Sequence, residues 1–156
     1  MSLTRRSNLA LAAIVVVYFA FGVAHLAQTP MFEKPDEEWH AAYVYYLLVQ
    51  RRLPPLVIDA EQNPAVQIAG HPPLYYAVAA SLLRATGLTQ VPPALQANPF
   101  WGYPAQGTTP DNKNRFLHAL GELGDPRYRP LYLLRGLSLL LGVGSVFAAY
   151  GIALAL

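Results

Sequence analysis

Two long apolar stretches, one at each end of the chain, frame a polar middle and limit what this sequence can fold into. All 14 prolines lie between Pro30 and Pro130, and all 9 acidic residues lie between Glu33 and Asp125. Charged residues make up only 13% of the chain, about half the share of a typical soluble domain. This division excludes a domain that is solvated on all sides and predicts a membrane protein.

Charge and cysteine content exclude further classes of protein. The formal net charge is only +2, so no strong field for a polyanion is present and we expect no nucleic-acid partner. The chain contains no cysteine, which excludes a disulfide scaffold, a cysteine-ligated zinc site and a thiol nucleophile.

The first apolar stretch, residues 9–28, predicts a transmembrane helix. About 20 apolar residues are needed to cross a hydrocarbon core of about 30 Å. Arg5 and Arg6 precede the stretch, so the positive-inside rule predicts that residues 1–8 are cytoplasmic. A cleaved signal peptide ending near Gly22-Val23-Ala24 is the alternative interpretation.

The second apolar stretch, residues 131–156, is long enough to cross a membrane again. Gly144 and Ala148 in it have the spacing that allows membrane helices to approach closely. Two spans with a cytoplasmic N-terminus place residues 29–130 outside the cytoplasm. The stretch is followed by no basic anchor, so we expect the chain to be the N-terminal part of a longer polytopic protein.

The predicted fold class is an all-α membrane protein, in which two transmembrane helices flank a large extracytoplasmic loop with two or three short helices. Proline and acidic residues at a helix start, and proline or glycine at its end, place two of these helices near residues 36–51 and 72–86. A third helix is expected near residues 112–121, where polar capping residues precede an apolar run.

The acidic cluster Asp36-Glu37-Glu38, followed by His40, is the sharpest candidate for chemistry. A carboxylate at the membrane surface is suited to take a proton from a hydroxyl nucleophile. The alternative is structural, because each acidic side chain at a helix start interacts favourably with the helix dipole and stabilises the helix by about 0.3–1 kcal/mol. The histidines show no metal-ligand spacing, so the sequence assigns no cofactor and leaves open whether a divalent cation takes part.

Arg135 is the single charge within the second apolar stretch. A charge inside a membrane helix is costly unless it is paired or reaches the interface. A contact to a lipid phosphate and snorkelling of the long side chain to the interface are the two interpretations of this arginine.

Four motifs occur in an order that resembles a known family. They are Pro-Asp-Glu-x-x-His at 35–40, His-Pro-Pro-Leu-Tyr-Tyr at 71–76, Asp-Asn-x-Asn-Arg-Phe-x-His at 111–118, and Leu-Arg-Gly-Leu-Ser at 134–138. Together with the two spans, they resemble the N-terminal part of bacterial GT-C glycosyltransferases, the relatives of dolichyl-phosphate-mannose (polyprenyl-phosphate-mannose) protein mannosyltransferases. The resemblance covers nearly the whole chain.

The resemblance implies an inverting glycosyltransferase of the bacterial inner (plasma) membrane. Such enzymes move a sugar from a polyprenyl-phosphate carrier to an extracytoplasmic acceptor. Carried over to this chain, the resemblance makes Asp36 the general base and Arg135 the group that stabilises the lipid phosphate. Glu37 would be the neighbour of Asp36 that either orients the acceptor or stands in as the base. Among the histidines, His40, His71 and His118 would line the substrate site.

Two other classes of protein remain open on the sequence. One is a small two-span accessory or structural subunit of a membrane complex, without catalysis. The other is a protein with a cleaved signal peptide and one C-terminal anchor. In the enzyme interpretation, further transmembrane helices, from the rest of the chain or from a partner subunit, complete the cavity, and we expect the 156-residue chain alone to be inactive.

Overall fold

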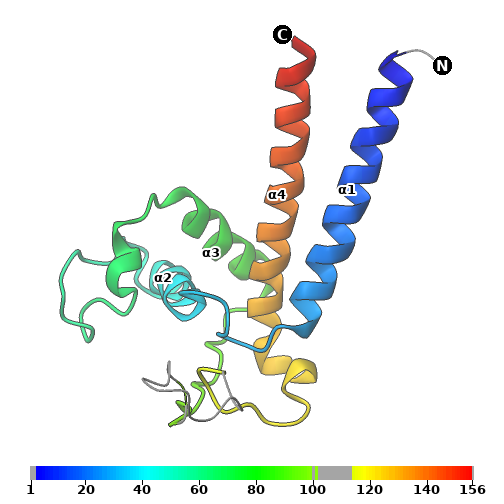
Figure 1. The fold of residues 1–156 in the computed structure, drawn as a ribbon. Coiled ribbons are helices and arrows are strands. Elements are labelled where there is room, and N and C mark those ends of the chain that lie inside the picture. The colour runs from blue at the N-terminus through cyan, green and yellow to red at the C-terminus, as the bar shows by residue number, and fades with distance from the viewer. Residues whose placement is uncertain (1–2, 100, 102–113, 156) are drawn as a thin grey trace, which may run out of the picture. The chain divides into compact units, whose positions relative to one another are not determined.

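The structure is a computed structural model that describes residues 3–99, 101 and 114–155. In these ranges it contains α-helices, short 3-10 turns and no β-strand. The order is α1 (Leu3–Gln28), α2 (Glu37–Gln50), α3 (Leu74–Thr86) and α4 (Arg129–Ala155) (Figure 1). The expectation of an all-α chain with two helices long and apolar enough to cross a membrane is confirmed over this part of the chain.

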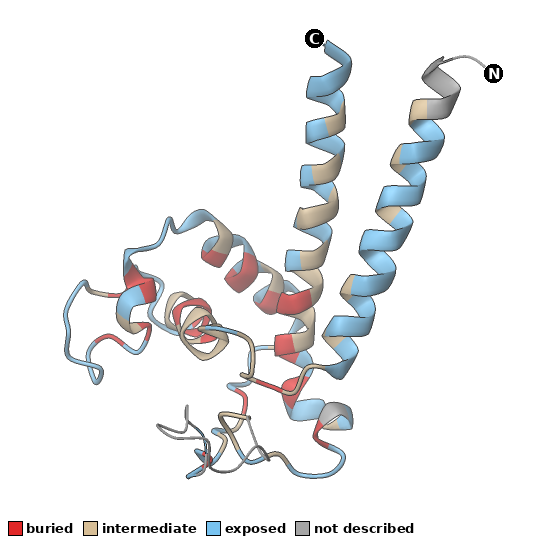
Figure 2. Cartoon of the chain, in the orientation of Figure 1, coloured by how far each residue is buried: buried red, intermediate tan, exposed pale blue. Residues whose placement is uncertain are grey.

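The chain divides into two compact units, and the first consists of residues 1–28 and 132–156. In it α1 and α4 run antiparallel, side by side (Figure 1). Most of their side chains are exposed, as Figure 2 shows. The 27 residues of α4 extend over roughly 40 Å at 1.5 Å per residue, which exceeds a hydrocarbon core of about 30 Å.

Close approach at glycine joins the two long helices. A Cβ atom added to Gly142 of α4 would overlap the Tyr18 hydroxyl of α1. A Cβ added to Gly22 would likewise overlap the side chain of Leu139. The approach on α4 is therefore at Gly142, whereas Gly144 has no side chain against it among the described residues.

The second unit comprises residues 29–131, and its core is the packing of α2 against α3. Tyr43 of α2 and Tyr76 of α3 stack with ring centroids 3.9 Å apart and planes 9° from parallel. Both rings are almost fully buried, as are Val44 on α2 and Leu83 on α3. An aromatic pair of this kind adds about 0.5–1.5 kcal/mol beyond the area that it buries.

Local signals explain where the two short helices end. Gly87 ends α3 in a left-handed conformation, with a φ of 71°, which glycine adopts without steric cost. Arg51 ends α2 in the same region, and its amide donates to the carbonyl of Leu47. The two helices lie within the ranges that proline and glycine predicted.

The helix expected near residues 112–121 is absent over residues 114–121, while residues 112–113 lie outside the described part. Residues 114–119 are extended instead, and Phe116 forms an antiparallel bridge with Ala97. The physical reason is that the amides of Arg115 and Phe116 donate to the carboxylate of Glu33. A 3-10 turn follows at Glu122–Gly124, and another at Pro126–Tyr128 leads into α4.

Candidate functional site

Asp36 occupies the N-cap position of α2, but its side chain makes no capping hydrogen bond. Its backbone is left-handed, with a φ of 58° and a ψ of 9°, a conformation uncommon for a residue other than glycine. The side chain accepts no hydrogen bond from the first turn, although aspartate at this position commonly does so. The half-buried Asp36 carboxylate forms no hydrogen bond or ion pair with any residue of the described ranges.

The acidic side chains around Asp36 are engaged by structural partners. Glu37 accepts a hydrogen bond from the amide of Phe32 at 2.9 Å. Glu38 forms an ion pair with Arg115. Glu33 receives three donors on its two oxygens. Asp36 is thus distinguished from its three acidic neighbours by its lack of such partners.

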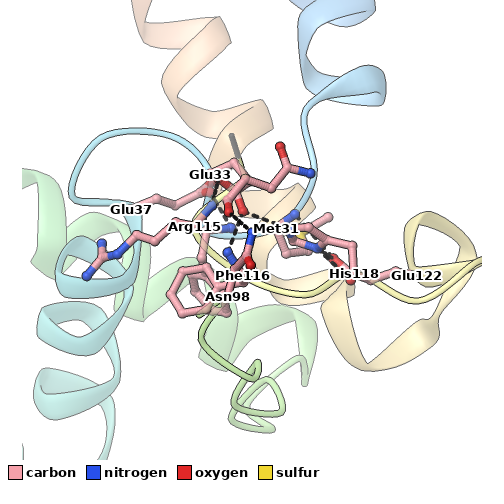
Figure 3. Close-up of polar contacts among 10 residues, drawn as sticks. Met31, Glu33, Glu37, Asn98, Arg115, Phe116, His118 and Glu122 are labelled. Carbon is pink, nitrogen blue, oxygen red and sulfur yellow. Dashed lines mark hydrogen bonds and ion pairs between the residues drawn. The ribbon is translucent and has the colours of Figure 1, made fainter. Parts of the chain in front are cut away.

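Glu33 joins the start of the second unit to its last segment (Figure 3). Its oxygens accept from the amides of Arg115 and Phe116 at 2.8 and 2.9 Å, and one of them also lies 2.7 Å from His118 Nε2. The other ring nitrogen of His118 lies 2.8 Å from the carboxylate of Glu122. We call Glu33, His118 and Glu122 the carboxylate–histidine link.

The protonation of His118 follows from these contacts. Burial favours the neutral ring and lowers its pKa, but hydrogen bonds to Glu33 and Glu122 favour the charged ring, and the net pKa is raised above 6.5. A protonated ring donates from both nitrogens, which matches a carboxylate on each side. The carboxylate–histidine link is therefore complete only when His118 carries a proton.

Arg115 holds a second set of contacts around the same segment. Its guanidinium lies 5.3 Å from the ring centroid of Trp39, 5.3 Å from that of Phe116 and 5.8 Å from that of Trp101. These distances fall within the range of cation–π attraction. Together with its ion pair to Glu38, Arg115 fixes the first turn of α2 to the extended segment.

A chain of three rings lies near Asp36, with His40 on α2, Tyr76 on α3 and His71 in the connection just before α3. His40 Nδ1 is 2.8 Å from the hydroxyl of Tyr76, and that hydroxyl is 3.3 Å from His71 Nδ1. Burial lowers the pKa of His40, and the nearby His71 lowers it further, whereas Asp36 and Glu37 act in the opposite direction. His40 is consequently a neutral ring at pH 7, one helical turn from Asp36.

Arg135 lies in the other unit, on α4. Its side chain is buried, with one guanidinium nitrogen 3.4 Å from the carbonyl of Leu26 at the end of α1. The guanidinium also lies 5.9 Å from the ring centroid of Tyr132. The contact with Leu26 joins the two long helices to each other at one end of the pair.

The structure groups the predicted site residues into three places. Asp36, Glu37, His40 and His71 lie around the first turns of α2 and α3, His118 belongs to the carboxylate–histidine link, and Arg135 lies on α4. Within the described ranges, no three side chains of histidine, aspartate or glutamate are arranged to hold a metal ion.

Sequence reasoning missed Glu33, Glu122 and Tyr76 as members of these clusters. The spacing of His118 and Glu122, four residues apart, was a visible signal, because such pairs are neighbours on one turn of a helix. No local pattern links Glu33 to His118, since 85 residues separate them.

Neither a protein family, nor a characterised protein, nor a solved structure gives a significant match to this chain.

Proposed function

We propose that this chain is the N-terminal, acceptor-activating part of a membrane glycosyltransferase that uses a polyprenyl-phosphate-linked sugar. In this proposal α1 and α4 cross the bacterial plasma membrane, the N-terminus is cytoplasmic, and residues 29–130 lie outside the cytoplasm. The carboxylate of Asp36 is the general base. The family resemblance suggests the reaction, and the two long apolar helices are compatible with the membrane location.

The observation that carries the proposal is the state of Asp36. Each of its three acidic neighbours is engaged with an amide, an arginine or a histidine, whereas the Asp36 carboxylate has no hydrogen bond or ion pair among the described residues. A base must keep an oxygen available for the proton that it removes. The left-handed backbone of Asp36, a conformation that persists at functional sites, is a second support.

The proposed chemistry is a single displacement at the anomeric carbon. Asp36 takes the proton of the acceptor hydroxyl while the acceptor oxygen attacks that carbon. The bond between the carbon and the phosphate oxygen breaks, and the electron pair leaves with the lipid phosphate, so the configuration inverts. Arg135 is the candidate partner for the phosphate charge, as expected for a cation near a leaving anion. Glu37 holds the backbone at Phe32 and so positions the first turn of α2.

Replacing Asp36 by asparagine tests the proposal in the complete protein in native membranes. We expect transfer of the lipid-linked sugar to fall by about 10²–10⁴-fold, the usual contribution of a general base. The matched control is Glu61→Gln, which also removes one carboxylate but at an exposed position in the connection between α2 and α3. Transfer retained by Asp36→Asn, with Glu61→Gln equally active, would remove Asp36 from the role of base.

A further inference from the structure

The connection between α2 and α3 carries apolar side chains that point into solvent. Leu53 is 56% exposed, Leu56 is 77% exposed and Ile58 is fully exposed. Val49, at the end of α2, and Val57 are exposed as well. Single exposed apolar residues are ordinary, but five within ten residues form a patch that indicates contact with another apolar phase. We call Leu53, Leu56, Val57 and Ile58 the apolar loop.

Hydrogen bonds from Asn63 hold the apolar loop in place. Asn63, which is almost fully buried, donates from its amide nitrogen to the carbonyls of Val57 and Val66 at 3.0 and 2.9 Å. The backbone amide of Asn63 donates to the carbonyl of Asp59 at 2.8 Å. These bonds fix the loop before any partner arrives, which lowers the entropy lost on binding.

Holding the loop in this form has a structural cost. The Oδ1 atom of Asn63 is buried and has no hydrogen-bond partner among the described residues, which is unfavourable for a polar atom. Val66 has a φ of 47°, a strained conformation for a β-branched residue. Strained backbone conformations persist mainly at functional sites. The strain at Val66 therefore indicates that the exposed apolar side chains of this connection have a function.

Two positive charges lie next to the apolar loop. Arg51 and Arg52 are exposed, and neither forms an ion pair with another residue of the described ranges. The two arginines are consecutive and Leu53 follows Arg52, so the charges border the apolar side chains in the sequence. Arginines beside exposed leucine and isoleucine suit a lipid surface, where phosphates meet the cations and the upper acyl chains receive the apolar groups. Most of this connection is pale blue, that is exposed, in Figure 2.

We infer that the apolar loop docks onto the surface of an anionic phospholipid bilayer, with Arg51 and Arg52 at the phosphates and Leu56 and Ile58 among the upper acyl chains. The inference rests on the membrane insertion in the proposed function. It adds a second attachment of residues 29–131 to the lipid, besides the ends of the two spans.

Site-directed spin labelling tests this docking, and the absence of cysteine allows each label to be placed at one position. The full chain is reconstituted in vesicles of phosphatidylglycerol and phosphatidylcholine, with a nitroxide at Ile58→Cys. Collision rates are measured with oxygen, which concentrates in lipid, and with a water-soluble nickel chelate. Glu61→Cys, three residues further on, is the matched control for water, and Val16→Cys in α1 is the control for the membrane span.

We expect the nickel collision rate at Ile58→Cys to be at least threefold lower than at Glu61→Cys, with a raised oxygen rate. The same shift is expected at Leu56→Cys, which guards against an effect of one substitution. Protection of Ile58→Cys should weaken in vesicles of phosphatidylcholine alone. Equal protection there would overturn the role of the two arginines.

Two other results would overturn docking on lipid. High collision rates with both reagents at Ile58→Cys would place the apolar loop in water. Low rates with both would place it against protein, such as a second copy or another subunit. Either result combined with a lipid signature at Val16→Cys refutes only this inference, whereas loss of that signature at Val16→Cys refutes the membrane insertion itself.

Discussion

Glu33 is the residue on which the position of the acidic cluster depends most. Its carboxylate binds amides that are 82 and 83 residues away in the sequence, and it also binds His118. Three donors on one carboxylate fix residues 31–38 against the extended segment at 114–118. In the proposed function, these contacts of Glu33 position Asp36 for the acceptor, and the Asp36 carboxylate makes none of them.

The stability of the carboxylate–histidine link should depend on pH. The pKa of His118 is raised in the folded chain, so its stabilising effect is complete below the unfolded pKa of 6.5 and is lost as pH rises through the folded pKa. We expect the hydrogen-exchange protection factors of the Arg115 and Phe116 amides to fall over that interval, because both amides donate to the carboxylate that His118 binds.

Two variants distinguish the effect of titrating His118 from the effect of titrating other histidines in the same unit. His118→Phe should lower the protection at every pH and abolish its pH dependence, whereas His71→Phe, at an exposed ring, should leave the dependence unchanged. Protection that is equally strong for His118→Phe at pH 6 would contradict a stabilising role for the charged ring.

The origin of the incorrect helix prediction near 112–121 is visible at this scale. Its capping residues and apolar run satisfy the local rules for a helix. What they omit is Glu33, whose oxygens take the amides of Arg115 and Phe116, and Ala97, which pairs with Phe116. Long-range partners override a local preference of this size.

At the scale of elements, the boundaries of α2 and α3 were accessible from sequence because prolines and a glycine limit them. The pairing of the two helices through Tyr43 and Tyr76 was not accessible, since period and composition do not say which aromatic residue meets which. The acidic candidates could be named from the Asp36-Glu37-Glu38 cluster. Only the structure distinguishes Glu37 and Glu38, which have partners, from Asp36, whose carboxylate has no hydrogen bond or ion pair among the described residues.

The close packing of α1 against α4 should be sensitive to a larger side chain at Gly142. Gly142→Leu places a side chain where the Tyr18 hydroxyl lies, so we expect it to destabilise the helix pair by about 1–3 kcal/mol. Gly144→Leu is the matched control, because a Cβ at that position meets no atom of the described residues within 4 Å. Thermal unfolding of the purified chain in detergent, followed by circular dichroism, measures both variants.

The sign of the difference decides the interpretation. Gly142→Leu should unfold at a lower temperature than the parent chain, and Gly144→Leu should unfold close to it. Equal losses in both variants would mean that helix propensity or detergent binding dominates, and would contradict the close approach at Gly142.

At the scale of the whole molecule, the antiparallel arrangement of α1 and α4 determines the topology of the chain. The end of α1 and the start of α4 lie at the same end of the helix pair, as the contact between Arg135 and Leu26 indicates. If both helices cross a membrane, residues 29–130 therefore emerge on one side. Arg5 and Arg6 predict that this side is extracytoplasmic.

Cysteine labelling tests this topology because the chain supplies no background thiol. We expect Ala94→Cys, an exposed position, to react with a membrane-impermeant maleimide in intact spheroplasts. Ser2→Cys should react only after lysis. Labelling of Ala94→Cys only after lysis would reverse the orientation and with it the proposed transfer outside the cytoplasm.

The distance in sequence between Glu33 and His118 also has a consequence for biosynthesis. Ribosomes add about 5–20 residues per second, so His118, which follows Glu33 by 85 positions, is added about 4–17 s later. During that interval α2 and α3 can already pair, because the hydrogen bond between His40 and Tyr76 spans only 36 residues. The contact between Glu33 and His118 can form only after the last part of the unit has been synthesised. We therefore expect the acidic segment to be fixed late in the folding of residues 29–131.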